Sequence, residues 1–128
     1  MENLKTEYEI DLTIPAKKNL VIIPRLVVAG LLSEQKITVE ELENIKLIIS
    51  EAVNLLFNSE GKINMKISLL KENDKNVLKV IISTNLTKEI LENLSKSGLT
   101  IHILNYLCSK FNVHQKQKEI EIFIEKEI

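Results

Sequence analysis

One acidic side chain and two amides stand close together in the most regularly patterned segment of the chain, residues 38–58. In a helix, Glu51, Asn54 and Asn58 fall on one side, because successive residues turn by about 100°. A carboxylate can take a proton from an attacking hydroxyl group, and an amide oxygen can bind magnesium, which requires oxygen ligands. This face of the helix therefore has groups that suit a nucleotide and its metal ion.

The same segment carries strong helix signals that would hold these groups in place. Thr38 and Glu41 form a Thr-x-x-Glu capping box, in which each side chain satisfies a backbone amide of the first turn. Apolar residues then recur at helical spacing on a second face, which also includes Ile48. We expect this second face to be buried against a β-sheet through Ile45, Ile49, Ala52, Val53 and Leu56.

The rest of the chain alternates between strand-like and helix-like patterns, without repeats or linkers. Alternating apolar residues predict strands, and apolar residues at helical spacing predict helices. Pro24 lies inside the first helical stretch and lacks an amide hydrogen, so we expect a kink or a short turn before the main helix. The expected strands are residues 8–14, 62–70, 77–83 and 120–124, and the expected helices are residues 16–32, 38–58, 88–94 and 100–111.

This order of elements predicts a single α+β domain over residues 1–128. A chain of 128 residues is long enough for one domain with its own core. Helices that are grouped between antiparallel strands pack together on one face of the sheet. The expected architecture is therefore a two-layer sandwich, in which a mostly antiparallel sheet of four strands is covered by helices on one face.

Composition argues against several classes of function. The net charge of −1 gives no field that favours nucleic acid or an anionic membrane, and the absence of Trp removes most stacking platforms. No apolar run is long enough to span a bilayer. Cys108 is the only cysteine, which fits a reducing compartment, and His102 and His114 lack neighbours at zinc-ligand spacing. We expect a cytoplasmic protein that binds no nucleic acid, membrane or structural metal.

Short motifs spread along the chain point to one family. Glu51 and Ala52 begin a Glu-Ala-x-x-Asn-like pattern, Pro15 and Ala16 end the first strand, and Arg25 lies in the helix that follows. Near the end of the chain, Gly98, Leu99 and Leu107 match a glycine- and leucine-rich helix. These motifs resemble the anti-sigma-factor serine kinases, small members of the superfamily that includes gyrase and the histidine kinases. The resemblance covers nearly the whole chain and implies a histidine kinase-like ATPase (GHKL) fold.

The resemblance also implies roles for individual residues, and the sequence departs from several of them. Glu51 would be the catalytic base, and the backbone at Gly98 would cradle phosphates at a helix start. Leu55 stands where the family has its magnesium-binding Asn, and Asn54 points about 100° away from that position. The remaining departures are Ser59 at the His position, Thr84 at the adenine-binding Asp, Leu86 and Lys88 at the glycines of the same motif, and Thr100 at the second phosphate-loop glycine.

Three functions remain open at this stage. The leading interpretation is an anti-sigma-factor-like regulator of transcription, which binds a sigma factor or an antagonist domain and has lost ATP binding. The first alternative is an active serine-protein kinase that uses ATP and magnesium, with Glu51 as base and with Asn54 and Gly98 at the nucleotide. The second alternative is a structural module that forms a homodimer through the sheet or through the first helix, where the apolar run of residues 26–32 suits an interface as well as a core.

Each of the site residues also has an ordinary structural interpretation. Glu51 is equally well explained as an acid on a helix surface, since Glu is a good helix former. Asn54 and Asn58 suit a solvated face and a helix end, and Gly98 suits a turn between two helices. Cys108 falls on an apolar face, where a cysteine packs as a small core residue.

Overall fold

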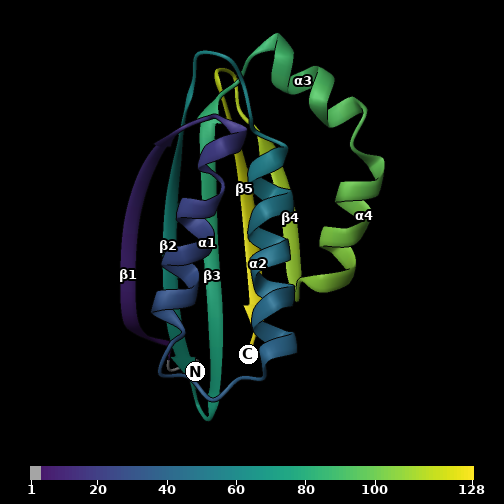
Figure 1. Ribbon diagram of the computed structural model, residues 1–128. Coiled ribbons are helices and arrows are strands. Elements are labelled where there is room, and N and C mark those ends of the chain that lie inside the picture. The colour runs from purple at the N-terminus through teal and green to yellow at the C-terminus, as the bar shows by residue number, and fades with distance from the viewer. Residues whose placement is uncertain (1–3) are drawn as a thin grey trace.

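The computed structural model describes residues 4–128, in which one open antiparallel sheet is packed against helices (Figure 1). Within these residues the sheet has five strands in the order β1-β2-β3-β5-β4. The strands are β1 (Leu4–Pro15), β2 (Lys62–Glu72), β3 (Lys75–Asn85), β4 (Lys110–Gln115) and β5 (Glu119–Glu127). The helices are α1 (Ile22–Leu31), α2 (Val39–Asn54), α3 (Lys88–Ser95) and α4 (Gly98–Leu107), and the short 3-10 turn η1 (Lys18–Leu20) precedes α1.

The α+β class and the antiparallel sheet are confirmed, but the prediction of four strands was wrong. We expected a helix over residues 100–111, whereas α4 ends at Leu107 and Cys108 has an extended backbone. From Lys110 onward the chain forms β4, in which Phe111 lies opposite Ile124 of β5. The sequence pattern misses this strand because Phe111 fits an apolar helix position as well as an apolar strand position.

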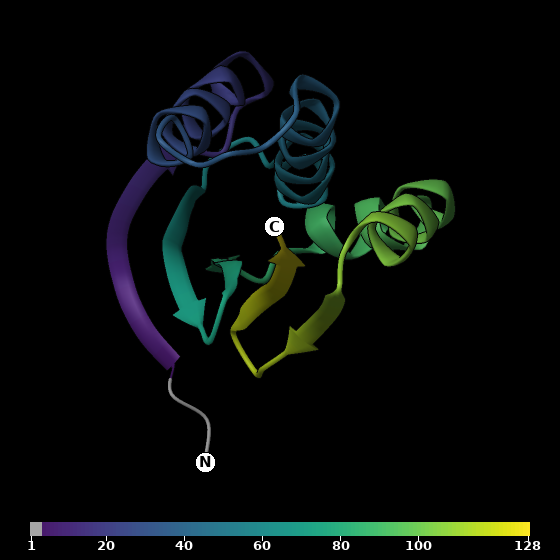
Figure 2. The same cartoon turned by 90° about the horizontal axis from the view of Figure 1, so that it is seen from below.

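The helices cover one face of the sheet. Figure 2 shows α1 and α2 side by side over the concave face, with α3 and α4 beyond α2 on the side of β4. Burial alternates along β3 in agreement with this arrangement, since one face is buried and the other is only partly covered. The buried face of β3 consists of Leu78, Val80, Ile82 and Thr84.

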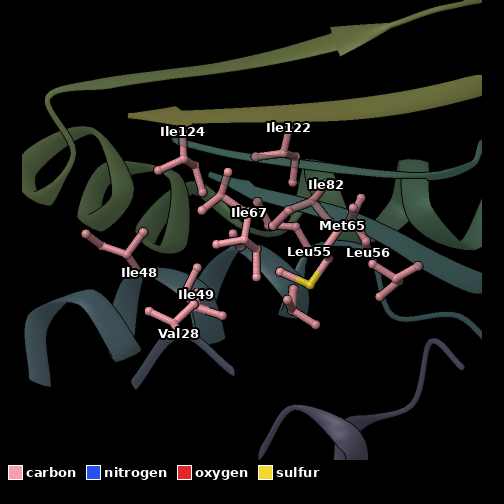
Figure 3. Packing of buried hydrophobic residues seen from close by; sticks show 14 of the residues in the cluster. Val28, Ile48, Ile49, Leu55, Leu56, Met65, Ile67, Ile82, Ile122 and Ile124 are labelled. Atoms are coloured by element: carbon pink, nitrogen blue, oxygen red, sulfur yellow. The ribbon is translucent and has the colours of Figure 1, made fainter. Parts of the chain in front are cut away.

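Helix α2 is the central element of the helical layer. The Thr38 half of the predicted capping box is confirmed, because the Thr38 hydroxyl oxygen accepts a hydrogen bond from the backbone amide of Glu41 at 3.0 Å. The predicted buried face is confirmed as well, and Figure 3 shows Ile48, Ile49, Leu55 and Leu56 packed toward Ile67 and Ile122 of the sheet. The residues of α2 and its C-terminal turn that are fully buried at 0% exposure are Ile45, Ile49, Ala52, Val53 and Leu56.

The start of the first helix and the end of α2 also differ from the prediction. The first helix begins at Ile22 rather than at residue 16, and η1 is the short turn expected before it. Pro24 therefore lies in the first turn of α1, where its missing amide hydrogen costs no helix bond. Helix α2 ends at Asn54 rather than at Asn58, because the next residues form a tight turn that leads into β2.

Candidate functional site

Glu51, the predicted base, is bound to the neighbouring helix. Its Oε2 accepts a hydrogen bond from the Thr100 hydroxyl group at 3.0 Å, which joins α2 to the first turn of α4. Thr100 occupies the position that the resemblance assigns to the second phosphate-loop glycine. The structure therefore brings together two positions of the expected nucleotide site, but it connects them directly to each other.

Leu55, at the position of the expected metal ligand, belongs to the hydrophobic core. Its side chain is 1% exposed and offers no oxygen to a magnesium ion. Asn54 precedes it and is exposed, so the amide points away from the core rather than toward the Leu55 position. The residues at this position thus do not fit a bound magnesium ion of the expected kind.

Asn58 holds the turn after α2 and does not share a face with Glu51 and Asn54, which corrects the predicted cluster. Its side-chain amide donates to the carbonyl oxygen of Leu56 at 3.1 Å, and its backbone amide donates to the carbonyl of Ala16 at 3.1 Å. The buried side chain also lies against Gly61, where an added Cβ would be 2.3 Å from the Asn58 Oδ1 atom. Asn58 is therefore a structural residue that connects the end of α2 to the end of β1.

Thr84, at the position of the adenine-binding Asp, is also used internally. It is 2% exposed, and its hydroxyl group donates to the carbonyl oxygen of Lys62 at 2.7 Å. Beyond it, Thr87 caps α3 by accepting a hydrogen bond from the Ile90 amide at 3.2 Å. The segment at the position of the family's adenine-binding motif thus forms a strand end and a helix cap.

A pocket of about 410 Å³ lies between the end of α2 and the turn that joins α3 to α4. Asn54 lines this pocket, Gly98 follows the lining residue Ser97, and Glu51 is not among the lining residues. The Asn93 side chain donates to the Phe57 carbonyl at 3.0 Å, and the Ser97 hydroxyl donates to the Asn93 carbonyl. The full lining consists of Lys18, Asn54, Phe57, Asn93, Lys96 and Ser97.

Sequence reasoning missed the two lysines of this pocket. Lys18 comes from η1 and Lys96 from the turn after α3, and neither forms an ion pair within the part of the chain that the structure describes. No local pattern joins these two residues, since only the chain fold brings them to the same pocket. The arrangement offers two positive charges and the Asn54 amide to a negatively charged group.

No metal centre is found among residues 4–128, which hold no cluster of three or more His, Cys, Asp or Glu side chains. His102 and His114 are both exposed, on α4 and β4 respectively. In the same residues, no helix is both long and apolar enough to cross a membrane.

Cys108 is partly buried at the end of α4 and packs against the core. Burial raises the pKa of its thiol to about 11, although the positive charge of Lys126 acts in the opposite direction. The thiol is therefore protonated at neutral pH, and a thiolate nucleophile is not available there.

Comparison with known proteins does not assign the chain to a family. No protein-family description matches the sequence. No curated protein is significantly similar to it.

Proposed function

We propose that this protein is a regulator of the anti-sigma-factor type, with a histidine kinase-like ATPase fold, that acts by binding another protein and has lost ATP binding. The observation that carries the proposal is the burial of Leu55, which is 1% exposed in the hydrophobic core. A nucleotide site of this type needs a metal ligand at the position that Leu55 occupies. The bonds of Glu51 to Thr100 and of Thr84 to Lys62 support it, because both polar groups are occupied within the protein. The partner is a sigma factor or an antagonist domain, as the sequence resemblance implies.

An apolar surface between α1 and β1 is suited to such a partner. Leu26 is 62% exposed and Ile22 is 47% exposed on α1, and Tyr8 is 50% exposed on β1. Leu26 and Tyr8 line a groove of about 530 Å³ that also includes Ile10 and Leu31. Exposed apolar residues that gather around a groove are typical of protein interaction sites.

The loss of ATP binding is tested by thermal unfolding with and without ATP and magnesium. A ligand at a hundredfold excess over its Kd stabilises a protein by about 2.7 kcal/mol, which is a readily measured shift in Tm. We expect no shift at millimolar ATP, and no transfer of labelled phosphate to a candidate antagonist domain. A clear shift would contradict the proposal.

Partner binding is tested with sigma factors and small antagonist domains from the same genome, by size-exclusion chromatography of purified mixtures. Leu26→Glu places a charge on the α1–β1 groove and should weaken the complex at least tenfold. Leu99→Glu is the matched control, because Leu99 is 74% exposed on α4, away from the groove. If no such protein binds, the assignment of the partner is wrong. If both variants bind as the wild type does, the assignment of the binding surface to the groove is wrong.

The active kinase is a second candidate, and the pocket with Lys18 and Lys96 favours it because two positive charges suit phosphate groups. In that case ATP and magnesium raise the Tm, and phosphate transfer disappears in the Glu51→Ala variant. We expect no rise in Tm and no phosphate transfer by the wild type. A base without a positioned phosphoryl group has nothing to act on.

The homodimer is a third candidate, and the same α1–β1 groove is the feature that favours it. Mass measurement in solution tests whether the protein forms a dimer. A dimer that becomes a monomer on Leu26→Glu substitution would place the dimer contact at this groove.

A further inference from the structure

Strand β4 forms one edge of the sheet, with β5 as its only neighbour in the strand order (Figure 1). Its backbone therefore has one row of polar groups bonded to β5 and one row at the free edge. Lys116 and Glu119 are a hydrogen-bonded pair, because the Lys116 amide donates to the Glu119 carbonyl at 2.8 Å. Bonded and unbonded pairs alternate along an antiparallel ladder. The free-edge amides and carbonyls are thus those of Phe111, Val113 and Gln115.

The two edges of the sheet differ in how well they resist pairing with another strand. Strand β1 has a bulge between Thr6 and Tyr8, and it ends at Pro15, which has no amide hydrogen. Bulges, prolines and charged side chains are devices that protect sheet edges. The register of β4 is continuous, and residues 111–115 contain no Pro, Lys, Arg, Asp or Glu. The edge of β4 is therefore the more open of the two to the addition of a strand.

The side chains of β4 are sorted by polarity onto the two faces of the sheet. Phe111 and Val113 lie opposite buried isoleucines of β5, and so on the face that the helices cover. Val113 is nevertheless 36% exposed. Lys110 and Lys116 belong to the other face, since successive residues of a strand alternate.

This edge also carries positive charge, because residues 109–118 include three lysines and no acidic residue. The Lys110 side chain is 69% exposed, and its Nζ atom lies 3.7 Å from Glu125. The Lys116 side chain is 62% exposed, and its Nζ atom lies 4.0 Å from Glu121. Such exposed ion pairs contribute little. The lysines therefore remain able to bind an incoming carboxylate.

A second copy of this chain matches the edge poorly. In the antiparallel pairing centred on Val113, Lys110 of each copy would lie opposite Lys116 of the other. Like charges directly opposite each other destabilise a strand pair. A strand in which acidic and apolar residues alternate fits better, because its carboxylates face the lysines and its apolar side chains extend the row of Phe111 and Val113.

We propose that the free edge of β4 binds an extended segment of another protein, in which acidic and apolar residues alternate, as a further strand of the sheet. Backbone hydrogen bonds to Phe111, Val113 and Gln115 provide the attachment, and Lys110 and Lys116 select the acidic sequence. This site lies at the opposite edge of the sheet from the α1–β1 groove and goes beyond the proposed function. Its test needs neither a sigma factor nor ATP, so the two can fail separately.

The probe is a blocked peptide of about nine residues, a usual strand length, in which glutamate and valine alternate. It is titrated into the full chain, and amide exchange is followed by NMR. In the free protein, the three free-edge amides should exchange faster than those of Asn112 and His114, which are bonded to β5. Saturating peptide should slow the free-edge amides by roughly tenfold, since each gains a partner. No binding at millimolar peptide, or protection only in other strands, would overturn the proposal.

Val113→Pro tests the role of the free-edge backbone. It removes one outward amide hydrogen without breaking a bond to β5, and proline is tolerated on edge strands. It should weaken peptide binding by roughly fivefold, the effect of one ordinary hydrogen bond. Val113→Thr is the matched control, because it keeps both the amide hydrogen and a β-branched side chain. Equal binding by the two variants would overturn the proposal.

Lys116→Glu tests the charge and remains informative if the proline variant does not fold. It should weaken binding by roughly fivefold, because a repulsive cross-strand pair replaces an attractive one. Lys36→Glu is the control with the same change in net charge, since Lys36 is exposed in the loop before α2. Equal losses in the two variants, or equal affinity of the wild type for a lysine–valine peptide, would overturn the proposal. Protection of the free-edge amides by rising protein concentration alone would show a second copy there, and would overturn it as well.

Discussion

Gly61 is required by the side chain of Asn58 rather than by its own backbone conformation. A Cβ added at Gly61 would lie 2.3 Å from Asn58 Oδ1, while the three glycines of the described chain all have negative φ. The amide of Asn58 fills this space because it is buried and bonded to the Leu56 carbonyl. One small residue thus allows the end of α2, the end of β1 and the start of β2 to meet.

We predict that Gly61→Ala lowers the free energy of unfolding by about 1–3 kcal/mol, since the methyl group must displace Asn58 and disrupt its hydrogen bond. Urea unfolding measures this loss. Gly30→Ala is the control, because nothing lies within 4 Å of a Cβ at Gly30 in α1. That substitution should be neutral or stabilising by up to about 1 kcal/mol. Similar losses in both variants would show that Asn58 does not explain the requirement at Gly61.

Cys108 gives a prediction about pH. Burial raises its thiol pKa to about 11, above the value of about 8.5 expected in the unfolded chain. The folded state therefore favours the protonated thiol, and this contribution to stability is complete below about pH 8.5. It is lost as the pH rises through about 11. We expect the difference in unfolding free energy between the wild type and Cys108→Ala to shrink between pH 8 and pH 11.

The same shift predicts slow alkylation of the folded protein by iodoacetamide at pH 8, since the thiolate is the reactive form. Denatured protein at the same pH is the reference. Equal rates for the folded and the denatured protein would contradict the raised pKa.

At this residue scale, the sequence identified Glu51 and its helix but not the bonding partner of Glu51. Nothing in the spacing connects Glu51 to Thr100, which are 49 residues apart and meet only because α4 packs beside α2. The same limit applies to Lys18 and Lys96, which reach one pocket from two separate turns. Local periodicity predicts which side of an element a residue takes, and it contains no information on which distant element faces that side.

Among the elements, α2 was the most predictable. Its Thr38 cap and its single apolar face are local features, and both are present. Its C-terminal end was not predictable, because Leu56 and Phe57 continue the apolar pattern although the helix has already ended. The turn there is set by the bond from the Asn58 amide to the Ala16 carbonyl, which is a contact between distant segments.

The buried face of α2 leads to a prediction about stability. Ile49 is 0% exposed, so Ile49→Ala should lower the free energy of unfolding by about 2–5 kcal/mol, as for other buried aliphatic residues. Leu47 on the same helix is 41% exposed, and Leu47→Ala should cost less than about 1 kcal/mol. Chemical denaturation of the two variants makes the comparison. A loss at Ile49 no larger than that at Leu47 would mean that the core does not rely on this face.

On the scale of the whole molecule, one core is built from both ends of the chain. Strand β5, the last element, lies between β3 and the edge strand β4 rather than at an edge. It contributes Ile120, Ile122 and Ile124, which are at most 1% exposed and face the same core as α2. Because no group of consecutive elements encloses this core alone, the described residues should unfold as one cooperative unit.

We therefore predict a single urea transition, as is usual for domains of this size. Far-UV circular dichroism follows the helices and strands, and methyl NMR signals of Ile122 and Ile124 follow the core at β5. The two midpoints should coincide, and Ile122→Ala should shift both by the same amount, because Ile122 is 0% exposed at the centre of the shared core.

Phe123→Ala is the neighbouring control, since Phe123 is half-buried on the opposite face of the sheet and should shift the midpoints less. Loss of the β5 signals before the circular dichroism changes would mean that α1, α2 and the first strands form a separate unit, and the prediction of one domain would then be wrong.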